Sequence, residues 1–142
     1  MLKTYDPNQV SISLAGILFK GYAEDEFVKV EASTDFFVDV VGVDGEDVTR
    51  SKTGDRRATV TIMLMQSSET NDLLSALLSR DDAAPGGAGV GAFYLKDGSG
   101  RTVIEGPQAW LMGPPAVSFG KQTSPREWKI RIAKTRRLDG GN

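Results

Sequence analysis

The sequence contains neither cysteine nor histidine among its 142 residues. Without cysteine there are no disulfides and no thiol nucleophile, and without histidine there is no imidazole for acid–base catalysis. The same two absences exclude nearly every zinc or copper site, because those metals depend on imidazole and thiolate ligands. Disulfide-stapled folds, cysteine or histidine enzymes and zinc proteins are therefore not candidates.

Long apolar runs and a basic excess are also missing. No apolar stretch approaches the ~20 residues needed to span a bilayer, and the opening MLKTYDPNQ lacks the apolar region of a signal peptide. The net charge of −2 and the pI near 5.2 argue against a DNA-binding surface, which normally shows a basic excess. We therefore expect a soluble protein without a membrane anchor, folded as one domain over residues 1–142.

The segment Thr59–Gln66 carries the clearest strand signal. Its side chains alternate, with Val60, Ile62 and Leu64 on one face and threonine and methionine on the other. A period of two with β-branched residues predicts a strand that is buried on one face.

A helix is predicted directly after this strand. Four leucines recur there with helical spacing, at positions Leu73, Leu74, Leu77 and Leu78. Ser68, Thr70 or Asn71 can cap the first turn. A helix of about three turns is marginal alone, so its leucine stripe must pack on a sheet.

The other periodic segments all read as strands separated by turn signals. They are Val10–Leu14, Ile17–Phe19, Phe27–Glu31, Phe36–Val43, Phe93–Lys96, Arg101–Glu105, Gln108–Met112 and a last strand around Trp128–Ile132. The count of many short strands and one helix predicts a mainly β fold, an antiparallel barrel or sandwich with one helix packed on its side.

The segment Gly42–Arg57 differs from its surroundings in having dense charge of both signs, three glycines and no aromatic residue. Asp44-Gly45 is a strong hairpin signal. Composition alone favours a solvated hairpin loop. Its charged residues are Asp44, Glu46, Asp47, Arg50, Lys52, Asp55, Arg56 and Arg57.

Catalytic equipment is not recognisable. The acidic groups Glu24-Asp25-Glu26, Glu46-Asp47 and Asp81-Asp82 each lie in a turn signal, where carboxylates favour solubility. The glycine-rich Asp81–Gly91 precedes a strand and lacks the Gly-Lys-Ser/Thr ending of a phosphate loop. We expect neither an enzyme nor a cofactor or metal site, and by exclusion a binding or structural protein.

The sequence resembles the tail-tube proteins of contractile-tailed bacteriophages across nearly its whole length. The matching motifs, in order, are Thr4–Val10, Val41–Glu46, Thr59–Gln66 with Asn71–Leu77, Gln108–Trp110 with Pro114-Pro115, Phe119-Gly120, Arg126–Trp128 and the Gly-Gly-Asn end. The resemblance implies two packed antiparallel sheets flanked by a helix, with a long β-hairpin arm. It also implies hexameric rings stacked into a tube inside a contractile sheath, which makes the protein part of the virion tail, assembled in the host cytoplasm.

Partners and contact residues follow from that resemblance. The implied partners are further copies of the chain, the tail sheath protein, the tape-measure protein, baseplate or terminator proteins, and phage DNA that passes through the bore without specific binding. Contacts within a ring are expected near Met63, Met65 and Trp110. DNA must slide through the bore without binding to its wall, so the wall should be neutral to acidic. The candidate residues to line it are Glu24, Asp25, Glu26, Glu31 and Asp39. The charged Gly42–Arg57 segment is expected to connect stacked rings.

Two alternatives stay open from the sequence. One is the tube of a related device that carries no DNA, such as a tailocin or a type VI secretion system. The other is a small monomeric all-β binding module.

Overall fold

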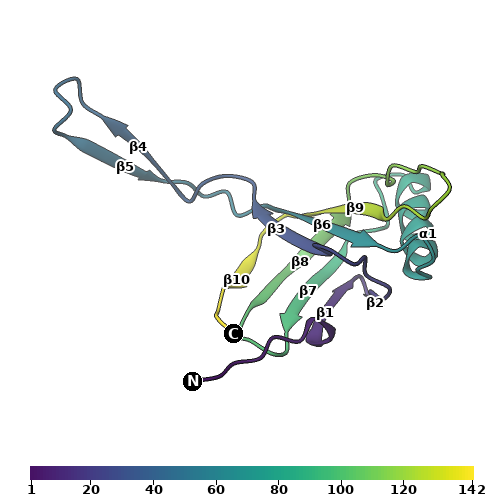
Figure 1. The fold of residues 1–142 in the computed structure, drawn as a ribbon. Helices are drawn as coiled ribbons and strands as arrows, with labels where there is room; N and C mark the ends of the chain where they lie inside the picture. The colour runs from purple at the N-terminus through teal and green to yellow at the C-terminus, as the bar shows by residue number, and fades with distance from the viewer.

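Ten β-strands and one α-helix form the structure of residues 1–142 in the computed structural model (Figure 1). The strands are β1 (Val10–Leu14), β2 (Ile17–Leu18), β3 (Val28–Ala32), β4 (Phe37–Val41), β5 (Val48–Lys52), β6 (Ala58–Leu64), β7 (Gly91–Asp97), β8 (Val103–Leu111), β9 (Arg126–Ile132) and β10 (Arg136–Leu138). The helix α1 spans Thr70–Ala83, and a short 3-10 helix η1 (Pro7–Gln9) precedes β1. A mainly β fold with one flanking helix and a hairpin arm is therefore confirmed.

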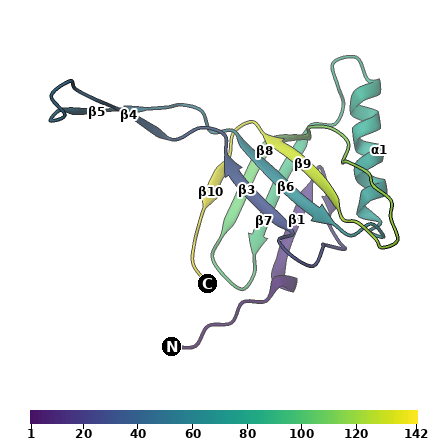
Figure 2. The ribbon, with the colours of Figure 1, turned by 45° about the horizontal axis from the view of Figure 1, so that its top comes forward.

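Eight strands form one antiparallel sheet in the order β2-β1-β7-β8-β9-β6-β3, and β10 pairs with β8 beside this path. The first residues of β8 pair with β10, whereas its last residues pair with β9. The sheet bends at β8, so that β3, β6 and β9 cross the strands of the other half (Figure 2). The two packed layers are thus halves of one bent sheet, which does not close into a barrel.

The bend depends on Gly106 and Pro107, where the sequence analysis expected a gap between two strands. The structure joins them into the single strand β8. A Cβ atom at Gly106 would lie 2.2 Å from Cγ2 of Ile132, so only glycine allows β8 to cross β9 this closely. Pro107 falls where β8 carries one more residue than β7, and a bulge tolerates the missing N–H.

The core confirms the alternation read from the sequence. One cluster holds all 17 buried apolar side chains, and the residues of β6 alternate between buried and half-buried along its whole length. Leu74 and Leu77 bring α1 into the same cluster, while Leu73 is 51% exposed. The apolar stripe of the helix is therefore narrower than expected.

The N-terminus of α1 is held by two hydroxyl groups. The hydroxyl of Ser68 accepts a hydrogen bond of 3.3 Å from the backbone N–H of Thr70, although the N-cap position itself is Glu69, whose side chain makes no capping bond. The hydroxyl of Thr70, which is buried, accepts one of 3.0 Å from the backbone N–H of Lys20. The start of the helix is thereby fastened to the segment that follows β2.

The segment Phe36–Val43, expected as a strand of the main sheet, lies outside it, and this expectation is wrong. β4 pairs only with β5, and every residue of both strands is exposed. The two strands form a thin arm that projects from the body (Figures 1 and 2). Its β-branched residues satisfy their strand preference by pairing within the arm, so apolar composition did not mean burial in this chain.

Candidate assembly surfaces

The arm has two different faces. Residues paired across β4 and β5 alternate between the faces, as in any two-stranded ribbon. One face, the charged face, carries Phe37, Asp39, Val41, Val48, Arg50 and Lys52, whereas the other carries Val38, Val40, Thr49 and Ser51. All of the charge of the two strands is therefore on one side.

Charge is also segregated along the arm. The turn at the tip, Gly42–Asp47, contains Asp44, Glu46 and Asp47 and no cation. The cations Arg50 and Lys52 lie on β5, and the guanidinium of Arg50 lies 4.2 Å from the ring centre of Phe37. The sequence showed mixed charge, and the structure orders it into an acidic tip and a shaft whose two cations outnumber its one acid, Asp39.

Asp55, Arg56 and Arg57, which the sequence analysis assigned to the arm, form its root. The carboxylate of Asp55 accepts hydrogen bonds from Nη2 and Nε of Arg57, at 2.9 and 3.0 Å, and from the hydroxyl of Thr34 at 2.5 Å. The bonds from Arg57, followed by that from Thr34, hold the pKa of Asp55 well below its usual range.

Arg56 fastens the root to the body. Its Nη1 donates to the carbonyl oxygens of Thr53 and Asp55 at 2.8 and 2.9 Å, and its guanidinium lies 3.9 Å from the ring centre of Phe36. Its own carbonyl oxygen accepts a bond of 2.8 Å from the backbone N–H of Thr135, just before β10. The point from which the arm projects is thus well connected.

Two of the three residues expected at subunit contacts share one surface. Met63 on β6 lies opposite Glu127 on β9, and Trp110 on β8 lies opposite Arg131 on the same strand. Both side chains are half-buried on the outer face of β6, β9 and β8, while Met65 follows β6 and is 49% exposed.

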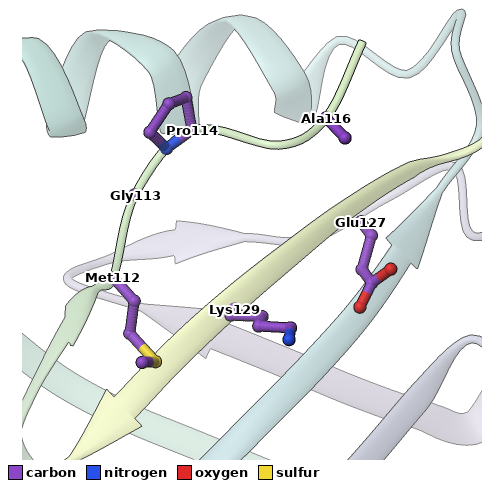
Figure 3. A pocket seen from close by; sticks show the side chains of 6 residues that line it. All are labelled: Met112, Gly113, Pro114, Ala116, Glu127 and Lys129. Atoms are coloured by element: carbon purple, nitrogen blue, oxygen red, sulfur yellow. The ribbon is translucent and has the colours of Figure 1, made fainter. Parts of the chain in front are cut away.

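Two hollows lie at the end of the body that is away from the arm. The first, of about 370 Å³, is bounded by the chain that leaves β8 and by β9 (Figure 3). Its lining residues are Met112, Gly113, Pro114, Ala116, Glu127 and Lys129. The second, of about 290 Å³, is lined by Ala23, Glu24, Asp25, Glu26, Met63, Met65, Gln66, Thr123 and Pro125.

These hollows adjoin each other, because Glu127 in the first pairs with Met63 in the second across β9 and β6. We call the two together the end groove. Its acids and methionines are far apart in the sequence, and only the fold brings them together.

The five acids expected to line a bore are not brought together. Glu24, Asp25 and Glu26 border the end groove, and Asp39 lies on the arm. Glu31 lies on β3, where its carboxylate is 2.7 Å from the ammonium of Lys29. The hydrogen bond from Lys29 lowers the pKa of Glu31.

The loop between β8 and β9, which was not expected to make a contact, exposes further apolar residues. Val117 and Phe119 are 57% and 81% exposed in the segment between β8 and β9. The sequence already indicates this exposure, because apolar residues in a loop rich in glycine, proline and serine do not belong to a strand that could bury them. Close to them, the guanidinium of the buried Arg126 lies 5.4 Å from the ring centre of Phe119.

No group of three or more acidic side chains is arranged to hold a metal ion. The helix α1 has neither the length nor the apolar character needed to cross a membrane. The exposed features of this molecule are therefore an arm, a groove and apolar patches.

Comparison with known proteins agrees with these features. Residues 9–139 match the family described as "Bacteriophage PhiTE tail tube protein". The chain is 35% identical to "Structural protein ORF10" of Pseudomonas phage KPP10 over 145 aligned positions, which cover 98% of this chain and 83% of that protein.

Two solved structures share the fold at low identity. One is the tube-terminating cap of the anti-feeding prophage (TM-score 0.58, 5% identity, 97% of this chain and 93% of that one). The other is the sheath/tube terminator of the extracellular contractile injection system PVC in its extended state (TM-score 0.56, 7% identity, 96% and 98%). The family match and the phage relative identify a structural protein rather than an enzyme, and the chain belongs to the bacteriophage PhiTE tail tube protein family.

Proposed function

We propose that copies of this chain form hexameric rings that stack into the inner tube of a contractile phage tail, through which DNA passes. The observation that carries the proposal is the fully exposed arm on a member of a tail tube family. An arm with no buried residue contributes little to the stability of its own subunit, so its use lies in contact with another molecule.

Ring closure would use the open ends of the main sheet. β2 and β3 end the sheet on either side, and their outer edges present unpaired backbone groups. Pairing between neighbouring subunits in a closed ring satisfies these groups without open-ended aggregation. Trp110 lies on the central strand β8, away from both edges, and its half-buried ring on the outer face is instead available for a contact between the faces of neighbouring subunits.

The arm would connect one ring to the next. Exposed ion pairs contribute at most about 1 kcal/mol each, but six arms acting together make a firm contact through multivalency. Because the charges of the arm are segregated, the contact also selects one register.

The bore remains a proposal, and we retain only Glu31 among its candidate lining residues. Glu31 lies on the outer face of the sheet together with Lys29, Lys129, Arg131 and Glu127, so β3 and β9 present three cations and two acids on this face, which is slightly basic rather than neutral to acidic. Lys129 and Arg131 have no ion-pair partner and would attract phosphates, so this face would let DNA slide only if acids of neighbouring subunits offset them. The sheath, tape-measure and baseplate or terminator proteins are the partners that such a tube requires.

Electron microscopy of the purified protein in negative stain, with light scattering, tests the proposal. We expect rings with six-fold averages, and tubes at higher concentration. A protein that stays monomeric at high concentration in several buffers would be the monomeric all-β module instead.

A second candidate is a tube terminator, favoured by the two structural matches. Gold-labelled antibodies against the chain separate the candidates on intact particles. Labelling along the whole contracted tail core indicates the tube, whereas labelling at one end indicates a terminator. Genes for a capsid beside this one would distinguish a phage from a tailocin.

A further inference from the structure

The arm and the end groove lie at opposite ends of β6. Ala58 begins β6 directly after the root of the arm, whereas Met63 and Leu64 end it beside the groove and α1 (Figure 1). When identical subunits stack in one orientation, the end of one faces the opposite end of the next. Given the stacking in the proposed function, the arm of each copy therefore points toward the groove of a neighbour.

The charged face of the arm presents three kinds of residue in a fixed order. The acids Asp44, Glu46 and Asp47 come first, at the tip. The facing valines Val41 and Val48 follow. Closest to the root lie Arg50, with Asp39 opposite it, and Lys52, with Phe37 opposite it, so this part carries two cations and one acid. Val41 and Val48 are 56% and 65% exposed.

The end groove presents basic, apolar and acidic residues in an order that can match the order on the charged face of the arm. Lys129 lies beside Met112 at one end, with its ammonium directed into the first hollow (Figure 3). Met63 and Met65 form the apolar middle, and Glu24, Asp25 and Glu26 border the other end. Glu127 lies between Lys129 and Met63, so the groove holds more acid than base.

The spacing of the charges agrees on both sides. The backbone N–H of Ala23 donates to the carbonyl oxygen of Met63 at 2.9 Å, so the acidic turn lies one strand spacing from β6, and β9 lies one spacing beyond. Two spacings separate Glu24 from Lys129 by roughly 10 Å. On the arm, three residues of strand separate Asp47 from Arg50, which is also about 10 Å.

We propose that the arm of one subunit lies in the end groove of a second copy in the adjacent ring. Arg50 and Lys52 lie against the acidic turn Glu24–Glu26, the two valines lie on the methionines, and the acidic tip reaches Lys129. The reversed direction would place tip acids on the acidic turn, so charge selects one direction. The proposal rests on the proposed function. It assigns Met63 to a contact between rings rather than within one ring, and it assigns the acidic turn to the same contact rather than to the lining of the bore.

Cross-linking can test this contact directly, because the natural chain has no cysteine. The variant Val48→Cys with Met63→Cys should form disulfide-linked multimers when assembled tubes are oxidised. Within one subunit Val48 lies near the tip of the arm and Met63 near the end of β6 that is away from the arm, beyond the reach of a disulfide, which needs Cα atoms about 4.4–6.8 Å apart. The matched control is Val48→Cys with Lys96→Cys, since Lys96 lies on β7 in the other half of the sheet. It should stay monomeric on a denaturing gel.

A charge exchange provides an independent test. Arg50→Glu and Glu24→Lys should each raise the critical concentration for tube growth by about tenfold or more, because the loss is repeated around the ring. The double variant should recover most of the loss, since it restores opposite charges. Asp82→Lys on the exposed side of α1 changes the charge equally and should leave the critical concentration unchanged.

The outcomes separate this inference from the proposed function. If the natural chain forms no tubes, the proposed function fails. If tubes form but the Val48/Met63 pair does not cross-link and the charge exchange gives no recovery, the tube stands and the groove is not the acceptor of the arm.

Discussion

The indole Nε1 of Trp128 donates a hydrogen bond of 2.9 Å to Oδ1 of Asn71, which ties the buried face of β9 to the first turn of α1. The amide nitrogen of the same asparagine donates to the carbonyl oxygen of Met65, also at 2.9 Å. One side chain therefore joins β9, the end of β6 and the helix. The sequence suggested Asn71 only as a possible cap.

Replacing this asparagine should destabilise the subunit. We expect Asn71→Ala to lower the free energy of unfolding by about 1–3 kcal/mol, because the buried indole N–H loses its partner. Urea denaturation measures the change. Asn8→Ala, at an exposed position whose side chain makes no hydrogen bond, is the matched control and should change the free energy by less than about 0.5 kcal/mol. Equal effects of the two substitutions would contradict the role of Asn71.

Gly106→Ala should damage the bend of the sheet. The added methyl group would overlap Cγ2 of Ile132, and we expect a loss of about 1–3 kcal/mol from overpacking. Gly120→Ala is a suitable control, because nothing lies within 4 Å of the site of its Cβ atom. Thermal unfolding followed by circular dichroism compares the two variants. An unchanged midpoint for Gly106→Ala would show that the crossing of β8 and β9 can relax.

Removing the arm should separate folding from assembly. We expect a chain that lacks Phe37–Lys52, with Phe36 joined to Thr53 through two glycines, to unfold at nearly the natural temperature, because no buried residue is lost. Rings should still form, whereas tubes should not. Calorimetry and electron microscopy check the two halves of this prediction. Normal tubes from the shortened chain would make the arm a simple surface loop.

The root of the arm should resist moderate acid. Because the folded-state pKa of Asp55 is lowered, its contribution is complete above its unfolded value near 3.9 and is lost as the pH falls through the lower folded value. Amide exchange at residues 53–57 should therefore not respond to charge at Asp55 between pH 8 and pH 5. Arg57→Ala should move the titration of Asp55, followed by carboxyl NMR, back toward the ordinary range. A natural Asp55 that already titrates near 3.9 would contradict the prediction.

The periodicity of apolar residues predicted those strands and the helix in which buried positions recur at regular spacing. In β6 and β9, alternate residues are buried as expected, because a strand at the centre of a sheet has one face toward the core. The helix was found from the leucine spacing, although only Leu74 and Leu77 are fully buried.

Elements whose placement depends on distant segments could not be predicted in this way. β4 has the apolar composition of a core strand, yet it lies in the arm, because composition does not tell which chain will cover a residue. The pair Gly106-Pro107 signals a break, and the single strand follows only from how closely β9 crosses there. The end groove joins four separate segments, so its mixture of methionines and acids appears only after folding.

The placement of arm and groove at opposite ends of β6 has a consequence for how a filament of these subunits starts and stops. Its two tips are chemically unequal, since one shows arms that hold nothing and the other shows empty grooves. If the arm of each ring is held by the groove of the next, growth at the two tips proceeds by different encounters, one in which an incoming ring supplies the arms and one in which it supplies the grooves. A protein that ends the filament must imitate an arm at one tip and a groove at the other, so a single capping protein cannot serve both with the same surface.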